Sequence, residues 1–189
     1  MSISKVETLI LGIDPGSRVT GYGLIQCSGS NHGLLHAGIW KSKEEDSADR
    51  LRHILQSALA FMRLHKPEAL AIEAPFYGKN IQSTLKLGRA QGVVIAAAFQ
   101  LNIPVFEYAP RRVKQAITGN GNAGKEQVAA MLPFLLTNSS CDHLPMDATD
   151  AIAVSLCHAF GLRKGSATGS GSSNWASFIK SNPNRVKGG

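Results

Sequence analysis

The first 40 residues carry the alternating and continuous apolar runs that are typical of β-strands. These runs span residues 8–14, 22–27 and 34–40. The segments between them are short and contain Gly, Pro, Ser and Asn, the residues that tight turns favour. Because short turns join antiparallel neighbours, the pattern predicts three antiparallel strands at the start of the chain.

From residue 46 onward the spacing of apolar side chains becomes that of a helix. Apolar residues recur every three or four positions, at Leu51, Ile54, Leu55, Leu59 and Met62. Either Asp46 or Ser47 can accept hydrogen bonds from the free N–H groups at the start of this helix. Pro67 cannot continue a helix, so we expect the helix to end before it.

Two further strands alternate with a long helix. Apolar runs predict strands at 69–73 and 105–108, with a helix at about 81–100 between them. Strands that alternate with helices lie parallel to one another in a sheet. The fold class expected from this order is therefore α/β, with a mixed five-stranded sheet flanked by helices.

The remainder of the chain predicts helices followed by a polar tail. A short helix follows Pro110, and a turn of Gly and Asn leads to a second helix that Pro133 ends or kinks. A last helix begins near Pro145 and runs through Ala159. We expect residues 1–162 to form one domain and residues 163–189 to be a mobile tail rich in Gly and Ser.

Four carboxylates stand at the ends of these apolar segments. Asp14 ends the first strand and Glu73 ends the fourth, while Asp147 and Asp150 lie three residues apart on one face of the last helix. Burying an ionised carboxylate costs several kcal/mol unless a counter-charge is present. Four converging acids have only each other, so their placement favours a site for a divalent cation. A helix-capping or ion-pairing role for individual acids is the alternative.

The charge balance favours a polyanionic partner. The chain has 20 Lys and Arg against 13 Asp and Glu, a net charge of +7. The tail contributes five basic residues and no acid: Arg163, Lys164, Lys180, Arg185 and Lys187. If a metal neutralises the four clustered acids, the rest of the surface is basic and attracts a nucleic-acid backbone.

Other signals exclude several classes of protein. No apolar run approaches the roughly 20 residues that a membrane span requires, and the start of the chain lacks the long apolar segment of a signal peptide. We therefore expect a cytoplasmic protein without a membrane partner. Cys27, Cys141 and Cys157 fit neither a disulfide framework nor the usual spacing of a zinc site.

Five segments resemble a known family. The element order is that of the ribonuclease H-like nuclease fold, and the motifs closely resemble those of the RuvC family of bacterial Holliday junction resolvases, in the order of that family. The segments are GIDPGSRVTGYGLI (12–25), AIEAPF (71–76), STLKLGRAQG (83–92), VFEYAPRRVKQAITGNGNAGKEQV (105–128) and MDATDAIAVSLCHA (146–159). Together the resemblance covers residues 8–160.

The resemblance implies that the four acids are catalytic. Asp14, Glu73, Asp147 and Asp150 occupy the matching positions of their motifs and are predicted to bind Mg²⁺, two ions per subunit when DNA is bound, for which Mn²⁺ can substitute. Mg²⁺ prefers oxygen ligands and retains water, which sparse carboxylates suit. Two such ions activate a water and stabilise a leaving oxygen in phosphodiester hydrolysis.

The resemblance also implies basic contacts to DNA. Lys114 and Lys125 match positions that the family places near the junction backbone, and Lys125 opens a helix after a Gly-rich turn, where it can hold the scissile phosphate and take part in catalysis. Arg111 and Arg112 are expected to contact the backbone without reading sequence. The alternative is that these are solvated surface residues.

An aromatic loop follows Glu73. By resemblance, Phe76 stacks on an unpaired base of the junction, and Tyr77 and Lys79 in the same polar loop are also expected to contact DNA. Packing into the core is the alternative for Phe76, although loops rarely bury a large aromatic side chain.

The predicted function is resolution of four-way DNA junctions by paired symmetric nicks, in recombination and repair. Cutting two strands symmetrically with one site per chain implies a homodimer, for which Leu85, Gly88, Gly92 and Ala96 offer a helix face. Packing of this face against the sheet is the alternative. Resemblance adds the branch-migration proteins RuvA and RuvB as partners. The alternatives are a nuclease of the same fold that acts on another nucleic acid such as RNA, and a junction-binding protein without catalysis.

Overall fold

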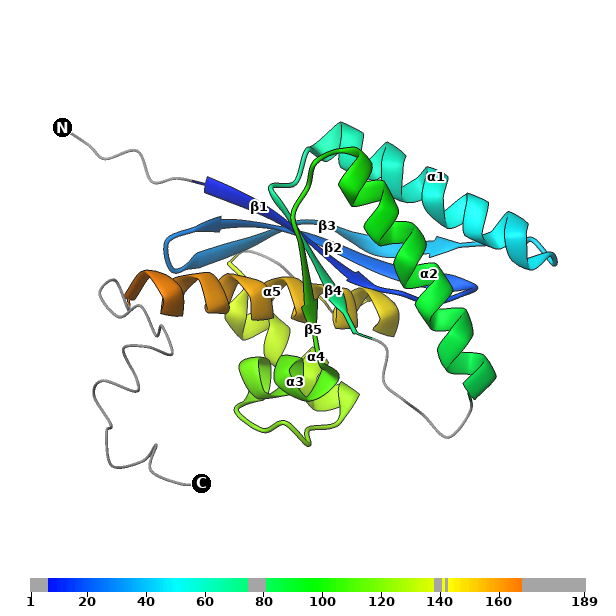
Figure 1. Ribbon diagram of the computed structural model, residues 1–189. Helices are drawn as coiled ribbons and strands as arrows, with labels where there is room; N and C mark the ends of the chain where they lie inside the picture. The colour runs from blue at the N-terminus through cyan, green and yellow to red at the C-terminus, as the bar shows by residue number, and fades with distance from the viewer. Residues whose placement is uncertain (1–6, 75–80, 138–140, 142, 168–189) are drawn as a thin grey trace, which may run out of the picture.

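A mixed β-sheet forms the centre of the molecule. The computed structural model describes residues 7–74, 81–137, 141 and 143–167. The sheet has the strand order β3-β2-β1-β4-β5 (Figure 1). β1 and β2, and β2 and β3, pair antiparallel, whereas β1 and β4, and β4 and β5, pair parallel. The strands are β1 (Glu7–Asp14), β2 (Val19–Ser28), β3 (Asn31–Lys41), β4 (Ala69–Glu73) and β5 (Val105–Tyr108). The predicted five-stranded α/β architecture is confirmed.

Helices cover both faces of the sheet, as Figure 1 shows. One face carries α1 and α2, and the other carries α3, α4 and α5. The helices are α1 (Ser47–His65), α2 (Ile81–Gln100), α3 (Pro110–Thr118), α4 (Lys125–Leu135) and α5 (Met146–Ala167). Within the described residues, no helix is long and apolar enough to cross a membrane.

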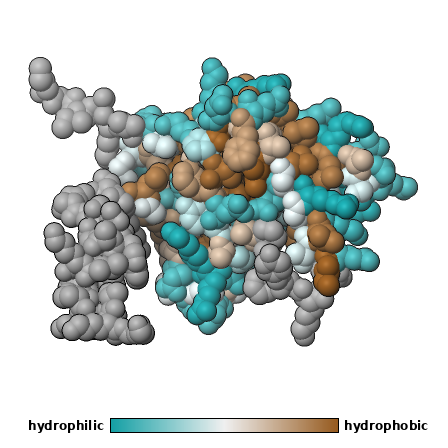
Figure 2. All heavy atoms as spheres, viewed as in Figure 1, coloured by the Kyte–Doolittle hydropathy of each residue, from teal (hydrophilic) through white to brown (hydrophobic). Residues whose placement is uncertain are grey.

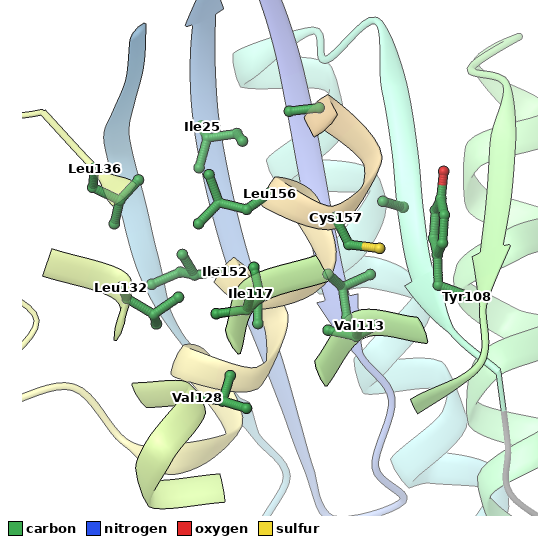
Figure 3. Packing of buried hydrophobic residues seen from close by; sticks show 14 of the residues in the cluster. Ile25, Tyr108, Val113, Ile117, Val128, Leu132, Leu136, Ile152, Leu156 and Cys157 are labelled. Atoms are coloured by element: carbon green, nitrogen blue, oxygen red, sulfur yellow. The ribbon is translucent and has the colours of Figure 1, made fainter. Parts of the chain in front are cut away.

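The core consists of two apolar layers, one on each face of the sheet. Successive side chains of a strand point to opposite faces. Ile10 of β1 therefore packs toward α5, whereas its neighbour Leu11 packs toward α1 and α2. Figure 3 shows the first layer, in which Ile152 and Leu156 of α5 lie against the side chains from the sheet, α3 and α4.

Glycines allow α5 to lie unusually close to the sheet. Gly12 of β1 pairs with Gly23 of β2, and Asp14 pairs with Gly21. A Cβ atom added to Gly12 would lie 2.0 Å from the carbonyl oxygen of Ala151, and one added to Gly21 would lie 1.9 Å from that of Asp147. Real Cβ atoms essentially never approach other heavy atoms within 3.0 Å. The absence of side chains at these positions therefore sets how near α5 comes to β1.

Several element ends differ from the sequence prediction. Asp46 caps α1 as predicted, because its Oδ1 accepts hydrogen bonds from the N–H groups of Ala48 (2.7 Å) and Asp49 (3.1 Å). α5 extends to Ala167, beyond the expected end at Ala159, and β2 begins at Val19, before the expected start at residue 22. Val19 and Thr20 pair with Lys41 and Trp40 of β3, which extends β2 over residues whose own apolar pattern is weak. Residues 168–189 of the predicted tail lie outside the described residues.

Candidate active site

Two of the predicted acids meet at one edge of the sheet. Asp14 is the last residue of β1, and Glu73 is the last residue of β4. The two strands are parallel neighbours, with Ile13 opposite Ile72. Ile13 and Ile72 are buried against α1 and α2, so the following residue of each strand points to the opposite face. The Asp14 and Glu73 carboxylates consequently lie together on the face that α5 covers.

Helix α5 brings a third acid to the same place. Asp14, Glu73 and Asp150 line one pocket of about 80 Å³. A water molecule needs about 10–15 Å³ of such space, so the pocket has room for several oxygen ligands. The remaining lining residues are Pro110, Val113, Lys114, Lys125, Val128 and Ala153. Asp147, the fourth predicted acid, is not among the residues that line the pocket, although its charge still contributes to the electrostatics of Asp14.

The pocket holds more negative charge than it can stabilise. Burial, followed by the charges of Glu73 and Asp150, raises the pKa of Asp14 from 3.8 to about 7. Burial and then the charge of Asp150 raise the pKa of Glu73 from 4.5 to about 7. With pKa values of about 7, each of the two carboxyl groups is close to half ionised at neutral pH. A bound cation would favour the charged forms and relieve this cost.

Lys125 supplies positive charge inside the site. Its Nζ donates to Oδ2 of Asp150, and the side chain of Asp150 is only 13% exposed whereas that of Lys125 is 58% exposed. This hydrogen bond raises the pKa of Lys125. Lys125 is the first residue of α4, whose start is fixed by the hydrogen bond from the Gly124 N–H to Oε1 of Gln127 (2.9 Å). Lys114 of α3 also lines the pocket, and its charge lowers the pKa of Glu73.

The donor set is suited to a hard cation that keeps part of its hydration. The metal-binding side chains that line the pocket are carboxylates, without a His or Cys among them. Mg²⁺ and Mn²⁺ prefer such oxygen ligands to nitrogen or sulfur. Among the described residues, no three His, Cys, Asp or Glu side chains are close enough to hold a metal ion by themselves. Water or substrate oxygens would therefore have to complete the coordination, as is usual for Mg²⁺.

Comparison with known proteins identifies the family. Residues 10–158 match the family model described as crossover junction endodeoxyribonuclease RuvC. The chain belongs to the RuvC family. A RuvC from Cytophaga hutchinsonii is 49% identical over 98% of this chain and 92% of its own length, and one from Porphyromonas gingivalis is 46% identical over 98% and 100%.

Solved structures agree with this assignment. The T. thermophilus RuvC, solved in complex with a Holliday junction substrate, has a TM-score of 0.77 and is 36% identical, and the match covers 84% of this chain and 96% of that one. The yeast mitochondrial Holliday junction resolvase Ydc2 has a TM-score of 0.58 at 11% identity, which shows a shared fold alone. The fold class predicted from the sequence is confirmed.

The other predicted site residues of this RuvC family member have different surroundings. The guanidinium of Arg112 lies over the Tyr108 ring, 5.2 Å from its centroid, so part of its positive charge already has an intramolecular partner. Arg111 is exposed beside the turn at Gly121. Phe76, Tyr77 and Lys79 lie outside the described residues.

Sequence reasoning missed two structural supports of the site. One is the set of glycines on β1 and β2 that admits α5, which the Gly content of an otherwise apolar strand could have indicated. The other is the buried hydrogen bond between the Tyr108 hydroxyl and Nδ1 of His158 (2.7 Å). Because Tyr108 pairs with Glu73 in the sheet, this bond ties the strand beside Glu73 to α5.

Proposed function

We propose that this chain resolves four-way DNA junctions by hydrolysing phosphodiester bonds at the pocket between β1, β4 and α5. The observation that carries the proposal is the gathering of Asp14, Glu73 and Asp150 with Lys114 and Lys125 in one pocket. Acids and lysines that line one pocket are suited to a reaction in which a metal and an ammonium group share the charge of a phosphate. Membership of the RuvC family supports a branched DNA junction as the substrate.

We propose Mg²⁺ as the metal, with two ions per subunit when DNA is bound and Mn²⁺ as a substitute. Asp14, Glu73 and Asp150 would supply ligands together with water or substrate oxygens, and Asp147 would join them near the start of α5. When bound, the metal supplies an activated water and charge stabilisation at the leaving oxygen. The chain itself contributes the ligands, lines the pocket with the apolar side chains of Val113 and Val128, and fixes α5 against β1.

Lys125 is proposed to bind the scissile phosphate. In the DNA-free protein its ammonium pairs with Asp150, so it is already held at the pocket. Because Lys125 is at the start of α4, free backbone N–H groups of the helix lie beside it. The ammonium group and these N–H groups both attract an anion. Lys114 would contribute charge from α3. Arg111, Arg112 and the loop residues Phe76, Tyr77 and Lys79 remain proposed DNA contacts.

A cleavage assay tests the proposal and separates it from the two alternatives. Purified protein would be incubated with Mg²⁺ and a synthetic four-way junction, a linear duplex or a structured RNA. We expect paired nicks in the junction alone, and no nicks with Asp14→Asn. Glu45→Gln, which removes an exposed acid, serves as the matched control and should cut normally. Preferred cutting of RNA, or junction binding without cutting by the wild type, would establish one of the alternatives instead.

Binding is expected to survive the loss of the catalytic acid. Asp14→Asn removes negative charge and no phosphate contact, so its affinity for the junction in a gel shift without metal should equal or exceed that of the wild type. Weaker binding by a folded Asp14→Asn protein would contradict the role assigned to this residue.

We also propose that the protein acts as a homodimer through the outer face of α2. Three large apolar side chains on this helix are exposed: Ile81 (74%), Leu85 (59%) and Phe99 (63%). Gly88 lies between them, and a Cβ added there would meet nothing within 4 Å, so a second helix can approach closely. Figure 2 shows apolar side chains gathered along the part of the surface that α2 forms.

The proposed occupant of this face is a second copy of the chain, because two symmetric cuts require two active sites related by a two-fold axis. Leu85→Glu should convert a dimer into a monomer in light scattering. Leu64→Glu, which alters an even more exposed leucine (75%) on α1, is the matched control and should leave the mass unchanged. A wild-type monomer at assay concentration, or an unaffected Leu85→Glu dimer, would contradict this interface.

The remaining sequence predictions stay proposals. RuvA and RuvB are proposed partners in branch migration, on the strength of the family alone. Residues 1–162 are proposed as the nuclease domain and residues 163–189 as a basic tail, of which residues 163–167 continue α5. The cytoplasm is the proposed location, as the sequence predicts.

A further inference from the structure

A second group of polar residues lies at the catalytic end of the sheet, on the opposite face. Ser17, Ser47, Arg50, Leu51, Lys86 and Arg89 surround one small depression. The depression combines three cationic side chains and two hydroxyls without a carboxylate. It lies where the amino-terminal ends of α1 and α2 meet the turn after β1, and Figure 1 shows these ends beside the same end of the sheet as the start of α5.

The depression is close to the catalytic acids. Ser17 follows Asp14 by three residues in the turn between β1 and β2. Consecutive Cα atoms are ~3.8 Å apart, so the Cα atoms of Ser17 and Asp14 are separated by at most about 11 Å. A DNA strand held at the acids can therefore also reach Ser17.

Two of the three cations are available for an external anion. Lys86 and Arg89 lie one turn apart on α2, are exposed, and make no ion pair with a carboxylate in the part of the chain that the structure describes. Arg50 differs, because its guanidinium donates to the carbonyl oxygens of Glu44 (3.1 Å) and Glu45. Arg50 therefore holds the segment before α1, whereas Lys86 and Arg89 supply unneutralised charge.

The acids nearest in sequence are already engaged. Asp46 accepts two backbone N–H groups at the start of α1, and Asp49 pairs with Arg52. Neither is among the residues around the depression. Glu107 lines an adjoining pocket with Arg89, and its Oε2 accepts a hydrogen bond from Gln91 (2.7 Å). No carboxylate lines the depression itself, so its lining carries net positive charge.

The size of the depression indicates the kind of anion. Its free space is about 10 Å³, enough for about one water molecule, so a small anion cannot be enclosed. A phosphate of an extended chain can instead rest on the surface, contacting the exposed Lys86 and Arg89 side chains from outside. Such contacts position a nucleic-acid backbone and read no sequence.

We propose that Ser17, Lys86 and Arg89 form a phosphate-binding subsite for the cleaved strand of the junction, a few nucleotides from the scissile phosphate. The inference rests on the proposed function, because it assumes that this strand crosses the acids at Asp14. The subsite would fix the strand on the side of the pocket opposite Lys125 and so help to place one phosphodiester over the carboxylates.

Salt-dependent binding tests the subsite. The Lys86→Gln/Arg89→Gln protein would be titrated with a synthetic four-way junction in EDTA, by fluorescence anisotropy over a range of NaCl concentrations. Two lost phosphate contacts should reduce the slope of log K against log salt by about 1.4–1.8, which weakens binding about 25- to 60-fold at 0.1 M salt. Ser17→Ala should weaken binding less and leave the salt slope unchanged, because serine carries no charge.

The chain offers a matched control of equal charge. Arg63 and Lys66 are also exposed, three residues apart, and line a depression at the opposite ends of α1 and α2. Arg63→Gln/Lys66→Gln should leave the affinity and the salt slope nearly unchanged. Equal losses in the two double variants would mean that only net charge matters, and would overturn the subsite.

The remaining outcomes separate this inference from the proposed function. Wild-type protein that neither binds nor cuts the junction refutes the function itself. Wild-type cleavage together with unchanged binding by Lys86→Gln/Arg89→Gln refutes only the subsite. Leu85 and Gly88 of the proposed dimer face are next to Lys86 and Arg89 in α2, so the mass of the double variant is also measured by light scattering. A change from dimer to monomer would attribute the loss of binding to the dimer and overturn the subsite.

Discussion

Replacing Asp14 with Asn should stabilise the metal-free protein while abolishing cleavage. The pKa of Asp14 is raised to about 7 by burial and by the neighbouring Glu73 and Asp150 carboxylates. In the unfolded chain the same group ionises at about its ordinary value of 3.8. Folding at neutral pH therefore either binds a proton at Asp14 or keeps an unfavourable charge. Asn has nearly the same shape and removes the charge.

The size of the effect follows from the two pKa values. A difference between 3.8 and about 7, at ~1.36 kcal/mol per pKa unit, corresponds to about 4 kcal/mol. Water at the pocket mouth and rearrangement of Lys125 reduce this figure, so we expect a gain of about 2–4 kcal/mol at pH 8. The cost is absent below pH 3.8, grows as pH rises from 3.8 toward 7, and is complete above 7. At pH 5 the pH is only about 1.2 units above 3.8, out of the full difference of about 3.2, so the gain should shrink to a little over a third of its value at pH 8.

Urea unfolding in EDTA at pH 5 and pH 8 measures this difference. Glu45→Gln is the control, since its side chain is exposed and its replacement should change the free energy of unfolding by no more than about 0.5 kcal/mol at either pH. Mg²⁺ should stabilise the wild type and so reduce the difference in free energy of unfolding between Asp14→Asn and the wild type at pH 8. An Asp14→Asn protein no more stable than the wild type at pH 8, or equally stabilised at both pH values, would refute this account of the site.

Two further substitutions test the supports of the pocket. In Gly21→Ala, the new Cβ would lie 1.9 Å from the Asp147 carbonyl oxygen, so the start of α5 must move by at least about 1 Å; we expect a stability loss of about 1–3 kcal/mol and at least a ~100-fold slower single-turnover cleavage. Gly161→Ala, in open space on the same helix, should cut normally, and equal behaviour of the two variants would contradict the close-packing argument. Lys125→Met should slow cleavage yet tighten Mg²⁺ binding to DNA-free protein about two- to fivefold in calorimetry, because the cation paired with Asp150 is gone. Lys114→Met removes a lysine that makes no ion pair with Asp150 in the described part of the chain, so it should change that affinity less. Weaker Mg²⁺ binding by Lys125→Met would show that Lys125 does not compete with the metal.

The order of strands and helices followed from the sequence because apolar periodicity reports directly which side of an element is buried. The ends of the strands and helices were harder to predict from the sequence. The first residues of β2 lack a strong pattern of their own and owe their strand structure to pairing with β3. When a segment becomes a strand because it pairs with a distant part of the chain, its own local sequence does not reveal this.

The sequence by itself determined the fold class, the four acids as candidates and the basic character of the surface. These depend on residue type, spacing and motif order, all of which are present in the unfolded chain. Only the tertiary structure decided that Asp14, Glu73 and Asp150 share a pocket that Asp147 does not line, and that Lys125 pairs with Asp150. These contacts join residues up to 136 positions apart, the separation of 14 and 150. Strand register and the close approach of α5 over Gly12 and Gly21 set their geometry, and neither quantity is encoded in any single segment.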